Sequence, residues 1–224
     1  MLAVNPIIYA FSVFVIAGLN VFAGLHGVER YGFKSTAIFF VITWVVSLFF
    51  EALSIQTGFP FGLYHYNIPS LIIFHVPVIV IFAYSGTGYF SWVLSHVLTG
   101  RYSAKLAGKW VFIVPFIATF IMLMWDLGVD PISSTVLSRW VWQRPGPYFG
   151  VPIQNYVGWF LVGFIFYQLF SLCLAKYDWI RPQKVNVLAS KPYWIEAAVV
   201  YGLIGLETIL ISVLSTTILQ CLRR

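Results

Sequence analysis

The sequence predicts an all-α integral membrane protein: a single multi-pass transmembrane domain over residues 1–224, with six or seven helices and aromatic-rich re-entrant or interfacial loops. Only 9% of the 224 residues are charged and 60% are hydrophobic, whereas a soluble domain carries about 25% charged residues. The mean hydropathy is +0.89. Apolar runs of about 20 residues, the length that crosses a hydrocarbon core, recur along the chain.

Six apolar segments are expected to be the spans: 6–25, 36–55, 71–98, 110–127, 156–176 and 195–219. The third is long for a single span. It contains Pro77 and the step Gly86-Thr87-Gly88, which predicts either a kink or a re-entrant break. A break there would raise the number of helices to seven.

The basic residues predict the orientation of the bundle. The net charge is +6, but these residues sit at the ends of apolar runs, which favours a membrane topology and argues against a nucleic-acid partner. Nine of them flank the loops after the first, third and fifth segments: Arg30, Lys34, Arg101, Lys105, Lys109, Lys176, Arg181, Lys184 and Lys191. The opposite side has four: Arg139, Arg144, Arg223 and Arg224. The odd loops are therefore expected in the cytoplasm, and the ends of the spans near Glu51 and Asp126 on the opposite face.

Three carboxylates lie within or just inside apolar segments: Glu51, Asp126 and Glu207. A charged side chain at mid-membrane costs roughly 2.5–3.5 kcal/mol on insertion scales, so such residues normally face the bundle interior and mark a site. The alternative is a structural hydrogen bond to a neighbouring helix. Removal from water disfavours the charged form of a carboxyl group, and a protonated carboxyl in an apolar pocket is what general acid catalysis requires.

Helical spacing predicts which face carries these groups. Thr119, Met122 and Asp126 recur at intervals of three and four residues, so they share one face of a helix. Asp130 would extend that face by a turn, but Pro131 disfavours helical geometry at the residue before it. We expect the chain to leave the helix at Asp130 and its side chain to bend back toward the site. Trp44, Ser47 and Glu51 form a matching stripe on the second segment.

Two loops, at 56–70 and 128–155, carry dense aromatic residues, and 19% of the chain is Phe, Trp or Tyr. One interpretation is a belt at the membrane interface. The other is a slot for a rigid polyene, in which aromatic faces stabilise a carbocation. The predicted pocket residues are Tyr64, His65, Tyr66, Trp142, Tyr148 and Trp159, with Asn155 holding a water molecule.

The motifs that are missing limit the chemistry. The four histidines have no metal-site spacing, and no HExxH, phosphate-binding loop or dinucleotide fingerprint occurs. No metal ion or organic cofactor is therefore expected. An Asp-rich diphosphate-binding motif is also missing, which favours a neutral hydrocarbon substrate.

The sequence resembles the membrane carotenoid biosynthesis proteins, a family that includes the carotenoid 1,2-hydratases of bacteria and archaea. The resemblance covers residues 40–165 and rests on Glu51, Thr57-Gly58, Phe61-Gly62, Tyr64-His65-Tyr66, Trp125-Asp126, Asp130-Pro131, Trp140-Val141-Trp142, Gly146, Tyr148-Phe149-Gly150-Val151-Pro152, Asn155 and Gly158-Trp159. It implies an integral membrane enzyme that adds water across the terminal isopropylidene double bond of an acyclic carotenoid end.

The leading hypothesis is that Asp126 protonates a terminal alkene of a lipophilic isoprenoid while Glu51 or Asp130 positions the water. A second is a terpene cyclase or isomerase in which the same cation is quenched without water; the product mass distinguishes the two. A third is a small lipid transporter or binding scaffold, which inverted repeats would favour. Membrane lipid is an expected partner in each case, and the oligomeric state stays open.

Overall fold

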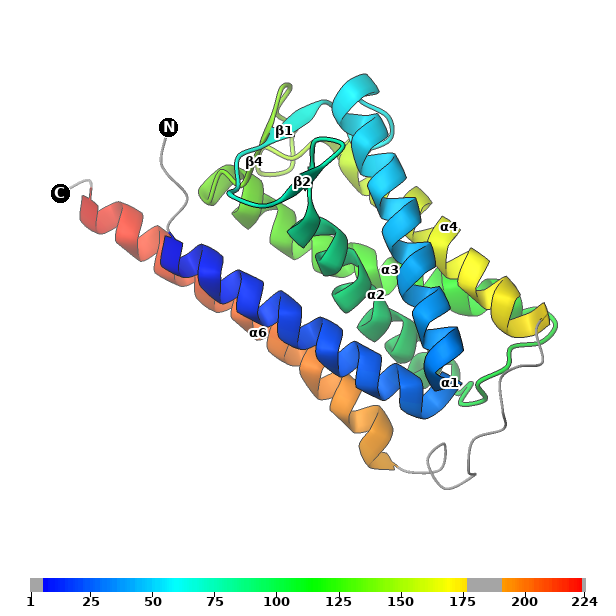
Figure 1. Cartoon of the computed structure of the whole chain (residues 1–224). Helices are drawn as coiled ribbons and strands as arrows, with labels where there is room; N and C mark the ends of the chain where they lie inside the picture. Colours follow the sequence, from blue (N-terminus) through cyan, green and yellow to red (C-terminus); the bar gives the residue numbers. More distant parts are fainter. Residues whose placement is uncertain (1–5, 177–190, 223–224) are drawn as a thin grey trace.

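The computed structural model describes residues 6–176 and 191–222. Across these residues, five helices are long and apolar enough to cross a membrane: α1 (Pro6–Thr57), α2 (Val78–Thr99), α3 (Trp110–Asp130), α4 (Ile153–Lys176) and α6 (Lys191–Leu222) (Figure 1). The predicted all-α, multi-pass membrane fold is confirmed.

The described residues contain five long helices rather than six, because the first two predicted segments belong to one 52-residue helix, α1. Its helical geometry is interrupted only at Gly32, with φ 77° and ψ 164°. Figure 1 shows the ribbon reversing direction at this bend, so the two halves of α1 form a V. Glycine adopts a positive φ without the steric penalty of a Cβ atom. One residue thus replaces the expected connecting loop.

Arg30, counted above as a loop charge, is fully buried next to this bend. Its guanidinium carbon lies 4.7 Å from the ring centre of Tyr31 and 4.6 Å from that of Trp194 on α6. A cation held against aromatic faces is stabilised by the ring quadrupole. Arg30 therefore joins the bend of α1 to α6 instead of facing the cytoplasm as a solvated charge.

The third predicted segment begins later than expected and is not broken. Residues 71–77 form a short hairpin, β2 (Ile72–Ile73) paired with β3 (Val76–Pro77), and α2 then runs without interruption. The predicted kink or re-entrant break at 86–88 does not occur. The glycines instead allow close packing: a Cβ atom on Gly86 would lie 3.1 Å from Asn20 Nδ2, and the Gly88 carbonyl accepts the Tyr167 hydroxyl at 2.8 Å.

The two aromatic-rich loops meet at one end of the bundle. Strand β1 (Tyr64–Tyr66) pairs antiparallel with β4 (Trp140–Trp142), with Tyr64 opposite Trp142 and His65 opposite Val141 (Figure 1). The loop that carries β4 also has β-bridges between Gly146 and Gly150 and between Tyr148 and Val151. Residues far apart in the sequence are thereby fixed beside the ends of α1 and α3.

The chain does not leave helical geometry at Asp130, the last residue of α3, as was predicted. Asp130 has helical geometry (φ −60°, ψ −48°), and the chain continues into a π-helical turn, η1 (Pro131–Val136). The Leu137 amide donates to the Ile132 carbonyl five residues earlier, at 2.9 Å. Proline is tolerated at the first position of a helical turn because its missing N–H has no partner there. The steric preference of the residue before proline is thus overridden.

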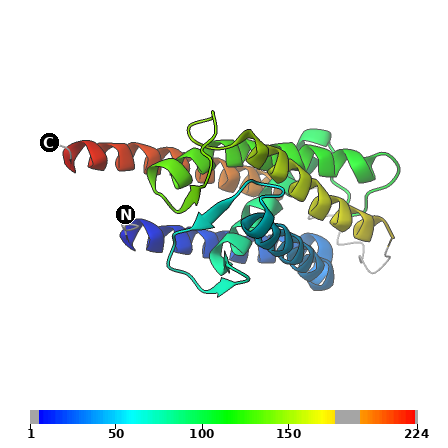
Figure 2. The same cartoon turned by 90° about the horizontal axis from the view of Figure 1, so that it is seen from above.

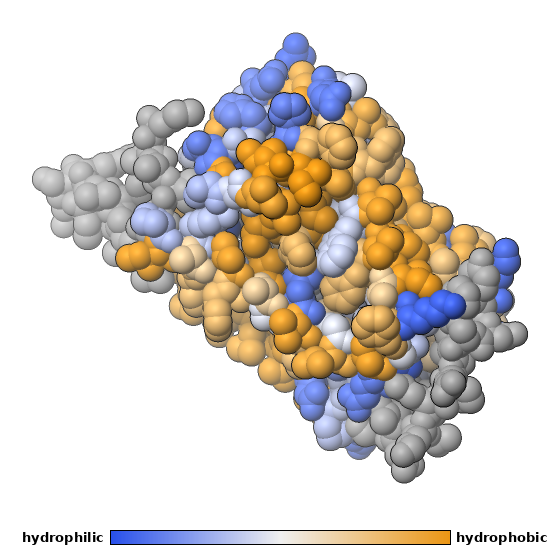
Figure 3. Space-filling view, in the orientation of Figure 1, coloured by the Kyte–Doolittle hydropathy of each residue, from blue (hydrophilic) through white to orange (hydrophobic). Residues whose placement is uncertain are grey.

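The outer surface suits a bilayer. On the face shown in Figure 3, apolar side chains cover the broad middle and hydrophilic ones gather toward the two ends. Viewed from above, the first half of α1 and helix α6 form two separate layers (Figure 2). The first half of α1 and helix α6 both contribute residues to the wall of the cavity described below.

The predicted orientation can be tested by cysteine labelling. His65, on β1, and Ala107, in the segment between α2 and α3, are both exposed. Figure 1 shows β1 and that segment at opposite ends of the bundle. In a protein whose native cysteines are replaced, we expect Ala107→Cys to be labelled from the cytoplasm and His65→Cys from the other side, because basic loops stay in the cytoplasm. Labelling of both positions from the same side would contradict this topology. Most of the basic segment 176–191 lies outside the described residues.

Candidate active site

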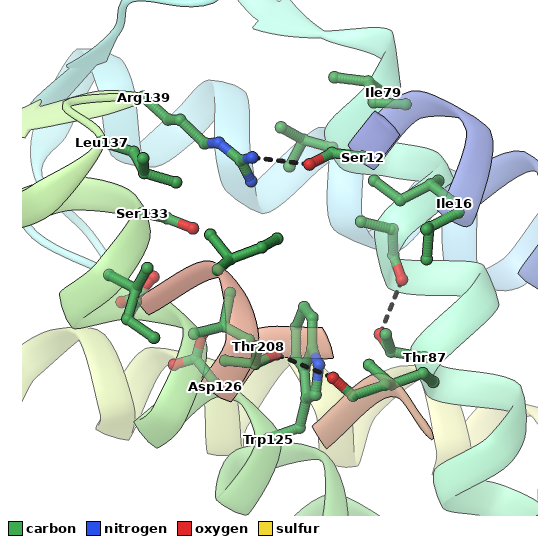
Figure 4. Close-up of a pocket in the computed structure, with 18 of the residues that line it drawn as sticks. Ser12, Ile16, Ile79, Thr87, Trp125, Asp126, Ser133, Leu137, Arg139 and Thr208 are labelled. Carbon is green, nitrogen blue, oxygen red and sulfur yellow. Dashed lines mark hydrogen bonds between the residues drawn. The ribbon is translucent and has the colours of Figure 1, made fainter. Parts of the chain in front are cut away.

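A cavity of about 140 Å³ lies between the first half of α1, α2, α3 with η1, and α6 (Figure 4). Most of its wall is apolar, including Val15, Ile16, Ile79, Val129 and Ile211. The ionisable carboxyl and guanidinium groups enter from α3, from the loop after η1 and from α6, and hydroxyl groups enter from α1, α2, η1 and α6. The space is thus a mostly apolar chamber with a few carboxyl and hydroxyl groups at defined places.

Asp126 and Asp130 lie one turn apart on α3, and both line this cavity. Their side chains are only 1% and 3% exposed. The Asn155 amide on α4 reaches both: Nδ2 donates to Asp126 Oδ2 at 3.3 Å and also to Asp130 Oδ2. Asn155 is itself held by its backbone N–H, which donates to the Pro152 carbonyl at 3.0 Å. One amide therefore ties the two carboxyl groups together.

Asn155 was predicted to hold a water molecule at the site. Its NH₂ group is engaged with the two carboxyl groups, and the residue is not part of the cavity wall. Asn155 thus bridges Asp126 and Asp130 from outside the chamber. The structure nonetheless brings these three predicted site residues into one cluster.

Glu51 is the centre of a second cluster. Its Oε2 atom accepts hydrogen bonds from the Tyr64 and Tyr66 hydroxyls, the latter at 2.7 Å, and its Oε1 atom accepts one from Tyr84 at 2.8 Å. Burial, together with the adjacent Glu51, raises the pKa of Tyr64 and of Tyr66 well above the ordinary value for tyrosine, so both phenols stay neutral donors. Glu51 does not line the cavity, and Tyr84 does.

Tyr84 and Trp159 make an aromatic wall between the two clusters. Their rings are stacked with centroids 4.4 Å apart and planes 5° apart, and Trp125 meets Trp159 edge-on at 6.1 Å. All three residues line the cavity. Trp159 was predicted as a pocket residue, whereas Tyr84 was missed because it lies in an apolar helix with no motif around it.

The other predicted aromatic residues lie behind this wall. Tyr64 packs against Trp142 at 4.9 Å and against Tyr66 at 5.3 Å, at the β1–β4 ladder. Tyr148 packs edge-on against Tyr156, and its hydroxyl donates to the Leu127 carbonyl at 3.4 Å. These residues support the site from outside the cavity.

His65 is not brought to the site. Alternate side chains of a strand point to opposite faces, so His65 lies on the outer face of β1 while its neighbours Tyr64 and Tyr66 face inward. It is exposed, as is its cross-strand partner Val141. The alternation could have been read from the sequence if residues 64–66 had been predicted as a strand.

Arg139 is a further cavity residue that sequence reasoning missed, because it was counted only as a loop charge. Its Nη2 atom donates to Ser12 Oγ on α1 at 2.7 Å (Figure 4). Burial lowers the pKa of Arg139 from its ordinary value, and Glu207, which lines the same cavity, opposes that shift. Arg139 and Glu207 thus lie on the same wall, and the Glu207 carboxyl group favours the charged form of Arg139. Among the described residues, no three His, Cys, Asp or Glu side chains come together as metal ligands would.

Residues 8–222 match the family model described as "Carotenoid biosynthesis protein". The chain belongs to this family. A curated relative, bisanhydrobacterioruberin hydratase from Haloarcula japonica, is 28% identical over 180 residues. That alignment covers 76% of this chain and 55% of the relative, so the chain spans about half the length of the relative it matches. No solved structure matches the chain significantly.

In this carotenoid biosynthesis protein, the family match extends over all five long helices, and thus over every residue of the two clusters. The resemblance noted from the motifs between Glu51 and Trp159 therefore holds for nearly the whole chain. The family assignment also agrees with a multi-pass membrane location.

A variant of Glu207 tests which carboxyl groups are needed for turnover. We expect Glu207→Gln to keep the fold and most of the turnover, because glutamine keeps the size of the side chain and Glu207 is separate from the Asn155 cluster. The loss of attraction to Arg139 should reduce stability by up to about 1 kcal/mol. Turnover per folded protein and the midpoint of thermal unfolding in detergent would measure both effects. Loss of turnover in well-folded Glu207→Gln would make Glu207 the better candidate for the acid.

Proposed function

We propose that this protein is a membrane enzyme that adds water to a terminal carbon–carbon double bond of an acyclic, carotenoid-like isoprenoid. The family membership and the hydratase activity in the name of the Haloarcula japonica relative support the class of substrate and reaction. The observation that carries the proposal is the pair Asp126 and Asp130, joined by Asn155, in the wall of an otherwise apolar cavity.

The pair suits the first step, proton transfer to carbon. Two adjacent carboxylates repel each other when both are charged, so such a pair tends to retain a proton. Asp126 delivers that proton to the CH carbon of the terminal isopropylidene group, and the π electrons of the double bond form the new C–H bond. The neighbouring carbon becomes a tertiary cation. The pair is left with an additional negative charge close to the cation, which stabilises it.

Aromatic faces suit the cation itself. The stacked rings of Tyr84 and Trp159, together with Trp125, line the same cavity as Asp126. A cation over such a face is stabilised by up to roughly 2 kcal/mol when water is excluded. The apolar remainder of the wall accommodates the hydrocarbon chain.

The second step is capture by water. A water oxygen forms a bond to the tertiary carbon, and its extra proton passes to the carboxylate pair, which restores the starting state. The net change is the addition of one water molecule, with no oxidation or reduction. Glu51, whose oxygens are occupied by three tyrosine hydroxyls, holds Tyr84 in place and takes no part in proton transfer.

Expression in a host that makes acyclic carotenoids and other polyprenes, followed by mass analysis of the extracted pigments, tests the proposal. We expect a product heavier than its precursor by one water, with Asp126→Asn as the inactive control. A product of unchanged mass would instead indicate the cyclase or isomerase. Bound lipid without any new product would indicate a transporter or binding scaffold.

A further inference from the structure

The π-helical turn after Asp130 places a hydroxyl group, that of Ser133, in the same cavity wall as the carboxyl pair. Asp126 and Asp130 are four residues apart on one face of α3, and Ser133 follows in η1. All three line the cavity, and Figure 4 shows the Ser133 side chain pointing into it. π-Helical turns occur frequently at functional sites.

The Ser133 hydroxyl differs from that of its neighbour in its hydrogen bonding. Ser134 Oγ donates to the Asp130 carbonyl at 2.8 Å, within the helix. The Ser133 hydroxyl makes no hydrogen bond within the part of the chain that the structure describes. Its backbone is nevertheless fixed, because the Ser133 carbonyl accepts the Arg139 amide at 2.8 Å. A rigidly held hydroxyl is thus left available to a molecule in the cavity.

We propose that Ser133 binds the water molecule that captures the substrate cation. This role rests on the proposed function and adds a residue to it. The Ser133 oxygen accepts a hydrogen bond from the water, and the carboxyl pair accepts the other, so a water lone pair is directed at the tertiary carbon. As the C–O bond forms, the proton facing the pair moves to the ionised carboxyl group.

Ser133 is the hydroxyl of η1 that faces the cavity. The Asn155 NH₂ group is occupied by the two carboxyl groups, and Arg139 Nη2 by Ser12. Arg139 Nε has no partner among the described residues, but it is a donor and cannot accept a hydrogen bond from water. A buried water needs two to four polar partners, and the carboxyl pair and Ser133 supply acceptors for both of its hydrogens. Without the hydroxyl, water is held less well, and the cation loses a proton to return to an alkene.

Isotopes separate the two steps. In D₂O, deuterium enters the carbon chain when the acid transfers it to the alkene, and it stays there unless the cation loses that same deuteron. In H₂¹⁸O, heavy oxygen enters only when water captures the cation. We expect wild type to incorporate both. Ser133→Ala should still incorporate deuterium, while its ratio of ¹⁸O to deuterium falls about tenfold, the effect of losing one good hydrogen bond.

Ser134→Ala is the matched control. It removes the neighbouring hydroxyl, which faces the helix backbone, and should keep the wild-type ratio. Ser133→Thr, which keeps a hydroxyl, should restore the ratio in large part.

Two outcomes would overturn the inference in different ways. An unchanged ratio in Ser133→Ala would remove Ser133 from water binding while leaving the proposed hydration intact. Wild type that incorporates neither isotope would show that no hydration occurs, and the proposed function and the role of Ser133 would then fall together.

Discussion

Asp126→Asn is expected to abolish turnover while leaving the fold and substrate binding nearly intact. Asparagine keeps the size of aspartic acid, and its carbonyl oxygen still accepts a hydrogen bond from Asn155. It has no acidic proton to give to carbon. General acid catalysis is typically worth about 10²–10⁴-fold, and the loss should lie at or above the upper end because a mostly apolar cavity excludes the bulk water that could act as a substitute acid. The measurement is product formed per folded protein, with substrate binding assayed separately.

Asp130→Asn is the matched variant, because it changes the other carboxyl group on the same amide. We expect a smaller loss, since the pair would lose its shared charge but keep its proton donor. Near-normal turnover in Asp126→Asn, or a larger loss in Asp130→Asn, would move the role of proton donor to Asp130.

Glu51→Leu is expected to have the largest effect on stability. It removes at once the acceptor for the buried hydroxyls of Tyr64, Tyr66 and Tyr84. Each unsatisfied buried donor costs about 1–3 kcal/mol, so the free energy of unfolding should fall by at least about 3 kcal/mol. Denaturant unfolding in detergent micelles would measure the loss. Glu51→Gln keeps a carbonyl acceptor and should be considerably more stable than Glu51→Leu.

Two comparisons separate this supporting role from a catalytic one. Tyr64→Phe in the Glu51→Leu background should recover part of the stability, since one fewer hydroxyl is left without a partner; contacting residues are expected to be non-additive in this way. Folded Glu51→Gln should retain turnover. If it were as inactive as Asp126→Asn, Glu51 would belong to the chemistry.

The sequence alone was sufficient for the class of fold and for the burial of the key carboxyl groups. Apolar length and low charge are enough to identify membrane spans, because crossing a bilayer depends on composition over about 20 residues. The cost of a charge in that medium likewise predicts that Glu51 and Asp126 face inward, and both are buried. Alternating spans also predicted that the two aromatic loops meet at one end, as the β1–β4 ladder does.

The tertiary structure decided how those residues are grouped. Helical spacing gives the face of a single helix, but the partner across that face depends on how helices rotate and approach each other. Such packing places Asn155 between Asp126 and Asp130, and it encloses Glu51 in tyrosines away from the cavity. Two backbone conformations could not be predicted from the sequence either, because they differ little in energy from their alternatives. One is the reversal at Gly32. The other is the π-helical turn, in which Asp130 keeps helical geometry and Ser133 lines the cavity. Local preferences of single residues, such as that of a residue before proline, are weak enough for the packing of the whole bundle to override them.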